Sequence, residues 1–356
     1  MAREYLANAL NYWVWSLLIL FEKFANSCRD NWTHTRYEAL LLLHSSGTSR
    51  SQSFWVWRWE IKLESSDLLF SRQSESLERV VMADSRRTVL ITGASSGIGC
   101  VTAHLLLDQG WNVFAAARRQ GAMDELQRRG AVVLPLDVAD AQSREDLAAE
   151  IHDRTGGRLD ALVNNAGYGE VGPMETMALE RARSMFEVNV FGLMGLTQLV
   201  LPAMRDRRRG RIVNVSSIAG RFATPGAGWY CASKHAVEAI SDAMRLELHQ
   251  FGIQVVLVEP GLIRTGFEQA SAESMDQGGK DPVWGEMMRR VAAGWAESFR
   301  KGSDPQLVAR TIATALQTNQ PKSRYLCGSE SEAVLLQPFV PAALWDVLVR
   351  RRLLGS

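Results

Sequence analysis

Residues 89–100 read VLITGASSGIGC, so a run of buried-strand residues stands directly before three glycines. The run VLI is typical of a parallel strand that is covered on both faces. Apolar residues at helical spacing follow over residues 101–106, which predicts a helix that packs back onto the strand. A strand, a glycine-rich turn and a helix in this order predict an α/β fold with an open parallel sheet and a phosphate-binding site at the turn.

Each glycine of the turn has its own expected role. Gly93 permits the tight turn, Gly97 lets the backbone approach a pyrophosphate, and Gly99 lets the helix pack closely on the strand. Free N–H groups at the start of the helix then face the anion. The spacing is TGxxxGxG rather than the commoner GxGxxG, and a glycine turn alone also suits a purely geometric role.

The composition fits one sizeable α/β enzyme domain with additional segments. The chain has 356 residues, is 46% hydrophobic and has a formal net charge of +1. This charge balance implies no nucleic-acid partner, and the basic residues 205–211 are interpreted as a solvated helix end. The four cysteines have neither metal-ligand nor paired spacing, so we expect no metal site, no disulfide framework and a cytoplasmic location.

The composition changes near residue 82. Residues 1–81 contain six of the eleven tryptophans, one glycine and no proline. We expect residues 1–82 to be an extension that is not a folded domain, residues 83–330 to be the catalytic domain, and residues 331–356 to be an amphipathic tail. The tail is compatible with a pocket cover, a subunit contact or a membrane-surface helix.

The N-terminal extension has two explanations. Translation that begins at Met82 would lead straight into the first strand, and this explanation is favoured. The alternative is a membrane anchor at residues 6–21, but this apolar run contains Asn8 and Asn11 and is shorter than the roughly 20 residues that span a bilayer. Interfacial membrane association remains a disfavoured alternative.

Apolar patterns predict the elements that follow the first helix. Strands are expected at residues 112–117, 131–136, 159–163, 211–215, 254–258 and 323–327, and helices at residues 143–154, 179–205, 230–251 and 304–316. Residues 267–300 are rich in Met and Trp, which suits helical core, whereas the resemblance to a known enzyme family implies a substrate lid there.

The end of the second predicted strand bears on the choice of cofactor. An acidic residue there would bind the ribose hydroxyls of NAD, whereas a basic one would bind the 2′-phosphate of NADP. Ala117 stands at this position and Arg118 follows. We therefore predict NADP(H) rather than NAD(H), although Arg118 is also compatible with a solvated loop.

Polar and small residues follow the next strands. Asp137, with Val138, is placed to accept a hydrogen bond from the adenine amine or to cap a turn. The segment NNAG at residues 164–167 offers amides that tie neighbouring strands together and small residues over which a cofactor can pass. Asn189 lies among apolar residues in the long predicted helix, where a buried amide must find partners.

Ser217 follows the predicted strand 211–215, and Tyr230 and Lys234 come later as Y-x-x-x-K. Positions i and i+4 lie on the same helix face, so the ammonium is expected near the phenol. Free tyrosine has a pKa of about 10, and lowering it by about 3 units takes roughly 4 kcal/mol of phenolate stabilisation. Lys234 is expected to supply part of it. An exposed helix pair is the alternative for Y-x-x-x-K taken alone.

Together these motifs resemble the short-chain dehydrogenase/reductase family over about residues 86–267, nearest to the branch of acyl-dihydroxyacetone-phosphate reductases, 17β-hydroxysteroid dehydrogenases and retinol dehydrogenases. The resemblance implies a Rossmann-type doubly wound parallel sheet of about seven strands. It implies a catalytic set of Asn189, Ser217, Tyr230 and Lys234. It implies cofactor contacts at Gly93, Ser95, Ser96, Gly97, Ile98, Gly99, Arg118, Asp137, Val138, Asn165, Ala166, Gly167, Tyr230, Lys234, Pro260, Gly261, Ile263 and Thr265.

In this family the carbonyl of the residue matching Asn189 holds a water linked to the lysine. The resemblance further implies hydride transfer between nicotinamide and a lipophilic carbonyl or secondary alcohol, with reduction favoured, and a homodimer or homotetramer paired through the long helices. Two alternatives are an NADP-binding sensor or scaffold without turnover and a membrane-tethered enzyme that uses NAD. The presence of both Tyr230 and Lys234 argues against the sensor.

Overall fold

The computed structural model describes residues 86–331 and 337–353, and the expectations for residues 1–82 lie outside this range. Seven parallel strands form one sheet in the order β3-β2-β1-β4-β5-β6-β7. The strands are β1 (Thr88–Thr92), β2 (Asn112–Ala117), β3 (Val132–Pro135), β4 (Ala161–Asn164), β5 (Gly210–Val215), β6 (Ile253–Pro260) and β7 (Arg324–Cys327). The predicted doubly wound sheet is confirmed.

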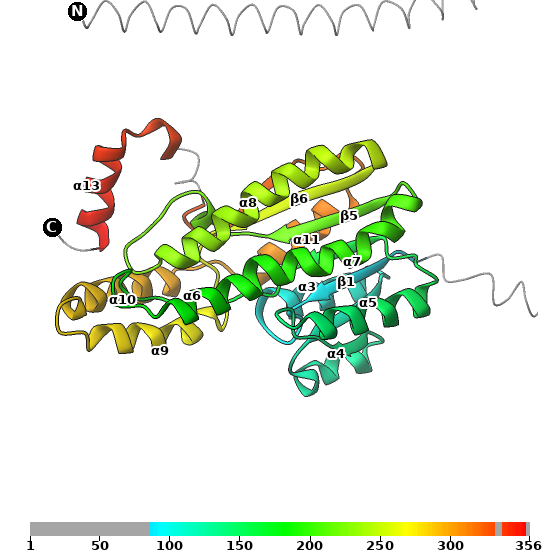
Figure 1. Ribbon diagram of the computed structural model, residues 1–356, viewed down its shortest axis with the longest axis horizontal. Helices are drawn as coiled ribbons and strands as arrows, with labels where there is room; N and C mark the ends of the chain where they lie inside the picture. Colours follow the sequence, from blue (N-terminus) through cyan, green and yellow to red (C-terminus); the bar gives the residue numbers. More distant parts are fainter. Residues whose placement is uncertain (1–85, 332–336, 354–356) are drawn as a thin grey trace, which may run out of the picture. The chain divides into compact units, whose positions relative to one another are not determined.

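Helices cover both faces of this sheet (Figure 1). They are α3 (Gly97–Asp108), α4 (Asp124–Arg128), α5 (Ala141–Thr155), α6 (Leu179–Phe186), α7 (Leu193–Asp206), α8 (Gly228–Leu248), α9 (Phe267–Gly279), α10 (Gly285–Arg300), α11 (Pro305–Gln317) and α13 (Ala342–Leu353). Short helical turns are η1 (Gln120–Met123), η2 (Glu187–Gly192), η3 (Ile218–Gly220), η4 (His249–Phe251) and η5 (Gln337–Phe339).

The alternation of side chains along each strand divides the core in two. In β1, Val89 and Ile91 pack with α3 and α11, whereas Leu90 packs on the opposite face with α5, α7 and α8. All three are completely buried, which is why the strand reads as a continuous apolar run. The carboxyl ends of the parallel strands share one edge, where the turn after β1 lies.

The predicted single helix over residues 179–205 is divided by a π-helical turn, η2, between α6 and α7. A π turn adds one residue to the helical repeat and re-aims the side chains around it. Asn189 lies in η2, and Gly192 brings the turn so close to the loop after β3 that a Cβ there would lie 2.4 Å from the carbonyl oxygen of Val138. The apolar pattern of the sequence has the ordinary helical period, so it does not predict one added residue in the helix.

The same run, Leu179–Asp206, is the one helix of the described residues that is long and apolar enough, by length and composition, to cross a membrane. Its residues Leu196, Val200 and Met204 are buried against the sheet. The apolar face is therefore used in the core of this fold.

The predicted lid over residues 267–300 consists of α9 and α10, which pack against each other. Met275 and Met288 are buried together with Val171, whereas Trp295 is partly exposed. Both sequence interpretations hold for different residues, because the methionines form a small core and Trp295 lines the cleft beneath. Helix α13 of the C-terminal tail contacts α10.

Candidate active site

A cleft of about 790 Å³ lies at the carboxyl ends of the strands. One end is formed by the glycine-rich turn and the loops after β2, β3 and β4, and the other by aromatic residues of α9, α10 and α13. All predicted cofactor-contact residues line this cleft except Gly99, and all predicted catalytic residues line it except Asn189. Gly99 and Asn189 lie behind the cleft and contact residues that line it.

The glycine-rich turn is held by the loop after β4. Gly93 has a φ of +68°, and a Cβ there would lie 2.9 Å from the Cα of Ala166. A Cβ at Gly99 would lie 2.5 Å from the Asn165 Nδ2, which donates to the carbonyl oxygen of Thr92 at 2.9 Å. Only glycine allows this approach of β4 to the turn.

The start of α3 suits an anionic group. Ser96 precedes the helix in an extended conformation and, within the described residues, its side chain makes no capping hydrogen bond. The first-turn N–H groups, which have no partner in the helix, therefore lie beside the cleft, where the helix dipole favours negative charge. These groups fit the pyrophosphate of a dinucleotide.

Two arginines follow β2 at the same end of the cleft. Arg118 and Arg119 both line it, and Arg119 Nη2 donates to the Ser96 hydroxyl at 3.4 Å. Ala117 before them is buried and uncharged. The sequence prediction named Arg118 alone, although the doubled arginine at the strand end was a visible signal for Arg119.

Asp137 has the capping role that its position after β3 suggested. Its Oδ1 accepts from the N–H of Ala139 at 3.0 Å, and its own N–H donates to the Ser143 hydroxyl at 3.0 Å. It also lines the cleft beside Val138. The turn-capping interpretation is confirmed, and the adenine contact stays a prediction.

Asn164 ties strands together rather than facing the cleft. Its Nδ2 donates to the hydroxyl of Thr197 on α7 at 3.0 Å and to Asn214 Oδ1 on β5 at 2.9 Å. Asn214 in turn donates to Ser241 of α8 at 2.8 Å. This buried polar chain fixes α7 and α8 to the sheet, as expected for hydrogen-bonded amides in a core.

Ser217, Tyr230 and Lys234 meet in the cleft. Ser217 follows β5, Tyr230 lies on α8, and both line the cleft. The Lys234 Nζ donates to the main-chain oxygen of Val215 at 3.0 Å and lies 5.9 Å from the centre of the Tyr230 ring. A strand end and one helix turn thus bring a hydroxyl, a phenol and an ammonium together.

The electrostatics of Tyr230 differ from the sequence expectation. Burial raises the pKa of the phenol above that of free tyrosine, and the hydrogen bond with Ser217 opposes this effect. Burial lowers the pKa of Lys234 to about 8, opposed by the negative charge of Glu238. Burial is the larger effect, so the net shift of the Tyr230 pKa is upward, opposite to the expected lowering.

Asn189 is a fully bonded core amide. Its Nδ2 donates to the carbonyl oxygen of Tyr168 at 2.9 Å and to the Ser233 hydroxyl at 3.1 Å, while its Oδ1 accepts from the Tyr168 N–H at 3.0 Å. Asn189 therefore joins η2, the loop after β4 and α8 next to Lys234. The predicted role of its carbonyl stays a prediction.

Aromatic side chains form the other end of the cleft. The Phe267 ring lies 5.4 Å from that of Tyr230, and Phe299 lies 5.9 Å from Trp295. Across from them, Phe222 lies 5.3 Å from Trp345 of α13. The predicted lid over residues 267–300 includes Phe267, Trp295 and Phe299, whereas Phe222 and Trp345 reach the cleft from segments far apart in the chain.

Comparisons with known proteins agree with this geometry. The family model described as short chain dehydrogenase matches residues 87–276. The 3-ketodihydrosphingosine reductase of Bacteroides thetaiotaomicron is 35% identical over 67% of this chain and 87% of its own length. The NADPH-dependent 3-dehydrocapnine reductase of Ornithobacterium rhinotracheale is also 35% identical, with the same coverage of 67% and 87%.

The structure is similar to that of a short-chain dehydrogenase from Streptomyces avermitilis, with a TM-score of 0.63 and 33% identity, covering 75% of this chain and 97% of that one. The family match spans the glycine-rich turn, the Ser217–Tyr230–Lys234 cluster and all but the last strand. The chain therefore belongs to the short-chain dehydrogenase/reductase family, oxidoreductases that act on CH–OH and C=O groups with a nicotinamide cofactor.

Proposed function

We propose that this protein reduces a lipophilic ketone or aldehyde with NADPH, using Tyr230 as the proton donor. The observation that carries this proposal is the meeting of Ser217, Tyr230 and Lys234 inside a cleft that has phosphate-binding features at one end and aromatic walls at the other. Tyr230 carries its proton at neutral pH, as a proton donor to a carbonyl oxygen must, because burial raises rather than lowers its pKa.

Each residue of the cluster has a distinct part in the proposed reaction. A bound reduced nicotinamide supplies the hydride. The Ser217 hydroxyl, which can donate and accept, holds the substrate oxygen within reach of the phenol. Lys234, fixed to Val215, places a positive charge beside the proton donor and stabilises negative charge that develops on it.

The two arginines after β2 support NADPH over NADH. Arg118 and Arg119 line the cleft at the end of β2, where the adenosine ribose lies in folds of this type. Guanidinium groups bind phosphate with paired, charge-assisted hydrogen bonds. The Ser96–Arg119 contact places one guanidinium beside the glycine-rich turn, and one of the similar reductases is NADPH-dependent by name.

The aromatic end of the cleft supports a lipophilic substrate. Phe267, Trp295 and Phe299 offer large apolar faces near Tyr230, and Trp345 of α13 lines the same cleft. Binding sites with such linings gain affinity mainly by burying apolar ligand surface. A relative that reduces a 3-keto compound by name is consistent with this class.

Pairing of two copies and a cytoplasmic location complete the proposal. Leu179 and Phe191 are 51% and 57% exposed and border an apolar groove with Phe186 and Trp229 on α6, η2 and α8. Such a surface suits contact with a second copy of the chain. The described cysteines are free thiols, which suits a reducing compartment.

The test is oxidation of NADPH and NADH by the full-length protein with a panel of lipophilic and small polar carbonyl compounds, beside Tyr230→Phe and Ser217→Ala. We expect turnover that prefers NADPH and lipophilic ketones, and a loss of roughly 10²-fold or more in kcat for Tyr230→Phe with NADPH affinity retained. NADPH binding measured by fluorescence without any turnover would instead support the sensor or scaffold alternative.

A further inference from the structure

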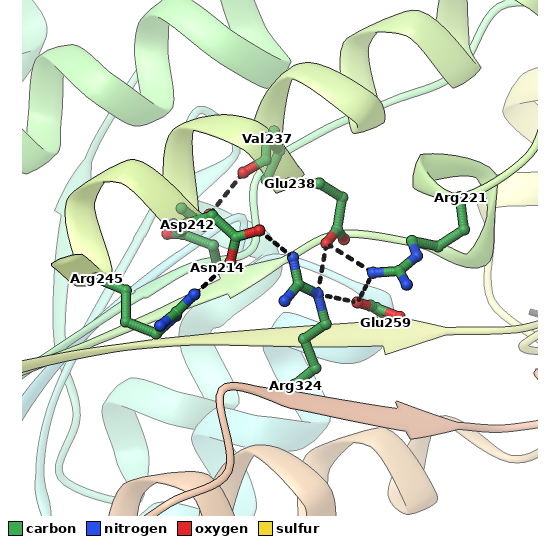
Figure 2. A network of polar contacts seen from close by, with 9 residues as sticks. Asn214, Arg221, Val237, Glu238, Asp242, Arg245, Glu259 and Arg324 are labelled. Carbon is green, nitrogen blue, oxygen red and sulfur yellow. Dashed lines mark hydrogen bonds and ion pairs between the residues drawn. The ribbon is translucent and has the colours of Figure 1, made fainter. Parts of the chain in front are cut away.

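A buried cluster of charged side chains joins α8, β6 and β7 (Figure 2). The carboxylates of Glu238 on α8 and Glu259 on β6 have side chains that are 9% and 1% exposed. Arg324 of β7 approaches both, with its Nε 3.1 Å from Glu238 Oε2 and 3.0 Å from Glu259 Oε1. Arg221 lies 3.8 Å and 3.6 Å from the same two oxygens. Two acids thus share two arginines.

Three parts of the cleft wall meet this cluster. Glu238 follows Lys234 by one helical turn on α8, so both lie on the same face. Gly220, in the turn that begins at Ser217, packs onto both, because a Cβ there would lie 3.0 Å from Glu238 Cγ and 3.1 Å from the Lys234 carbonyl oxygen. Glu259 directly precedes Pro260, which lines the cleft.

The surroundings of Lys234 make Glu238 its principal counter-charge. Val215 of β5 gives it a carbonyl oxygen, and a Cβ at Gly167, in the loop after β4, would lie 3.6 Å from its Nζ. On α8, Tyr230 and Glu238 stand one turn before and one turn after Lys234, and Lys234 and Glu238 are both buried. Burial lowers the pKa of Lys234, and the charge of Glu238 acts in the opposite direction.

We propose that Glu238 is a positioning residue whose buried carboxylate, held in place by two arginines, provides the counter-charge that keeps Lys234 in its ammonium form. Without that carboxylate, desolvation acts on the lysine unopposed, and the ammonium loses its proton closer to neutral pH. Only the consequence for turnover rests on the proposed function. The effect on Lys234 itself is a property of the protein alone.

The charge of the cluster depends on the protonation of Glu259, its second carboxyl group. The charged groups around Glu238 are Lys234, Arg221, Arg324 and Glu259. Burial and the neighbouring carboxylate of Glu238 raise the pKa of Glu259 to about 7. Below that pH Glu259 is neutral, so Glu238 is the one carboxylate of the pair that both arginines hold by charge. Arg324 is also fixed by Asp242, which its Nη2 contacts at 2.5 Å.

The test is an NMR titration of Lys234 in the full-length protein labelled with ¹³C at lysine Cε. The chain has six lysines, and Lys234→Met identifies the resonance. We expect Glu238→Gln to lower the Lys234 midpoint by on the order of one pH unit. Glu247→Gln, the same change on the exposed part of α8, should leave the midpoint where it is in the unaltered protein.

The direction of the shift separates a counter-charge from a merely structural role. If Glu238→Gln only loosened the interior, water would reach Lys234 and its midpoint would rise toward the ordinary lysine value. An unchanged or raised midpoint in Glu238→Gln therefore overturns the proposal. Glu238→Asp, which keeps the charge, should restore most of the midpoint.

A folding defect in Glu238→Gln is handled by a second variant. Glu238→Gln/Arg324→Gln removes both partners of the ion pair, so no unpaired guanidinium stays buried. The midpoint should still fall, because Glu238 is the charge that acts on Lys234, and an unchanged or higher midpoint would refute the inference. Absence of carbonyl turnover in the unaltered protein would contradict the proposed function and leave this titration unaffected.

Discussion

The ammonium of Lys234 and the main-chain oxygen of Val215 are joined by a hydrogen bond of 3.0 Å. Val215 is the last residue of β5, so this bond fixes the lysine to the sheet edge at which the cleft opens. The described structure thus gives the ammonium a main-chain acceptor. In the proposed reaction the lysine acts on Tyr230 as a placed charge, and its protonation would control activity.

Activity should therefore decline as the pH rises through about 8, where Lys234 loses its proton. The ammonium is present below this value and absent above it. Lys234→Arg keeps a cation at every accessible pH, so its lower activity should show no such decline. Profiles of kcat against pH for both proteins measure this. An identical alkaline decline in Lys234→Arg would assign it to another group.

Removing the arginines after β2 should reduce the preference for NADPH. Arg119→Ala, and separately Arg118→Ala, should raise the KM for NADPH by roughly tenfold or more and leave that for NADH nearly unchanged, because charge-assisted hydrogen bonds contribute about 1.5–3 kcal/mol. Steady-state kinetics with both cofactors measure this. Arg128→Ala, which removes an exposed arginine of α4, is the matched control. Equal losses for both cofactors would argue against a 2′-phosphate site.

Gly99→Ala should damage both stability and cofactor binding. The added Cβ would lie 2.5 Å from Asn165 Nδ2 and 2.5 Å from the Gly93 carbonyl oxygen, so the turn and the loop after β4 must separate. We expect a loss of about 1–3 kcal/mol in the free energy of unfolding, together with weaker NADPH binding. Gly121→Ala, where a Cβ meets nothing within 4 Å, should change neither. Urea unfolding and fluorescence titration test both variants.

Trp345→Ala should weaken binding of large lipophilic substrates in particular. Trp345 lines the cleft and contacts Phe222, so its loss removes apolar wall that a small substrate does not reach. The KM for bulky ketones should rise several-fold while kcat for small aldehydes is retained. Leu344→Ala, on an exposed position of the same helix, should have no such effect. A uniform change across all substrates would place Trp345 outside the substrate site.

Glu259→Gln should gain stability relative to the unaltered protein as the pH rises. The folded state raises the pKa of Glu259 from 4.5 to about 7. Between these values the folded protein keeps a proton that the unfolded chain has released, so the stability contribution of Glu259 is complete below pH 4.5 and falls as the pH rises to about 7. The neutral amide avoids this loss of at most about 3 kcal/mol.

Urea unfolding of Glu259→Gln between pH 5 and 8 measures the gain, with Glu247→Gln as the exposed control. The difference in the free energy of unfolding should grow up to about pH 7 and then level off. A constant difference over this range would mean that Glu259 titrates at its ordinary value.

Several features of the site follow from short patterns in the sequence. The run VLI, the three glycines and the helical spacing after them are local, and together they predict a turn at a strand end where a phosphate can bind. The spacing of Tyr230 and Lys234 likewise places them on one helix face. The parallel sheet could therefore be predicted from local patterns, whereas the full set of cleft residues rested on the resemblance to the family.

The sequence by itself determined the parallel α/β sheet, the glycine-rich turn and the helix face that carries the phenol and the ammonium. Only the tertiary structure decided that Ser96 meets Arg119, that Lys234 binds Val215, and that a π turn carries Asn189. It also brought Arg324 to Glu238 across 86 residues of sequence. Hydrophobic periodicity encodes which face of an element is buried, whereas polar pairing depends on which distant elements become neighbours when that burial is satisfied.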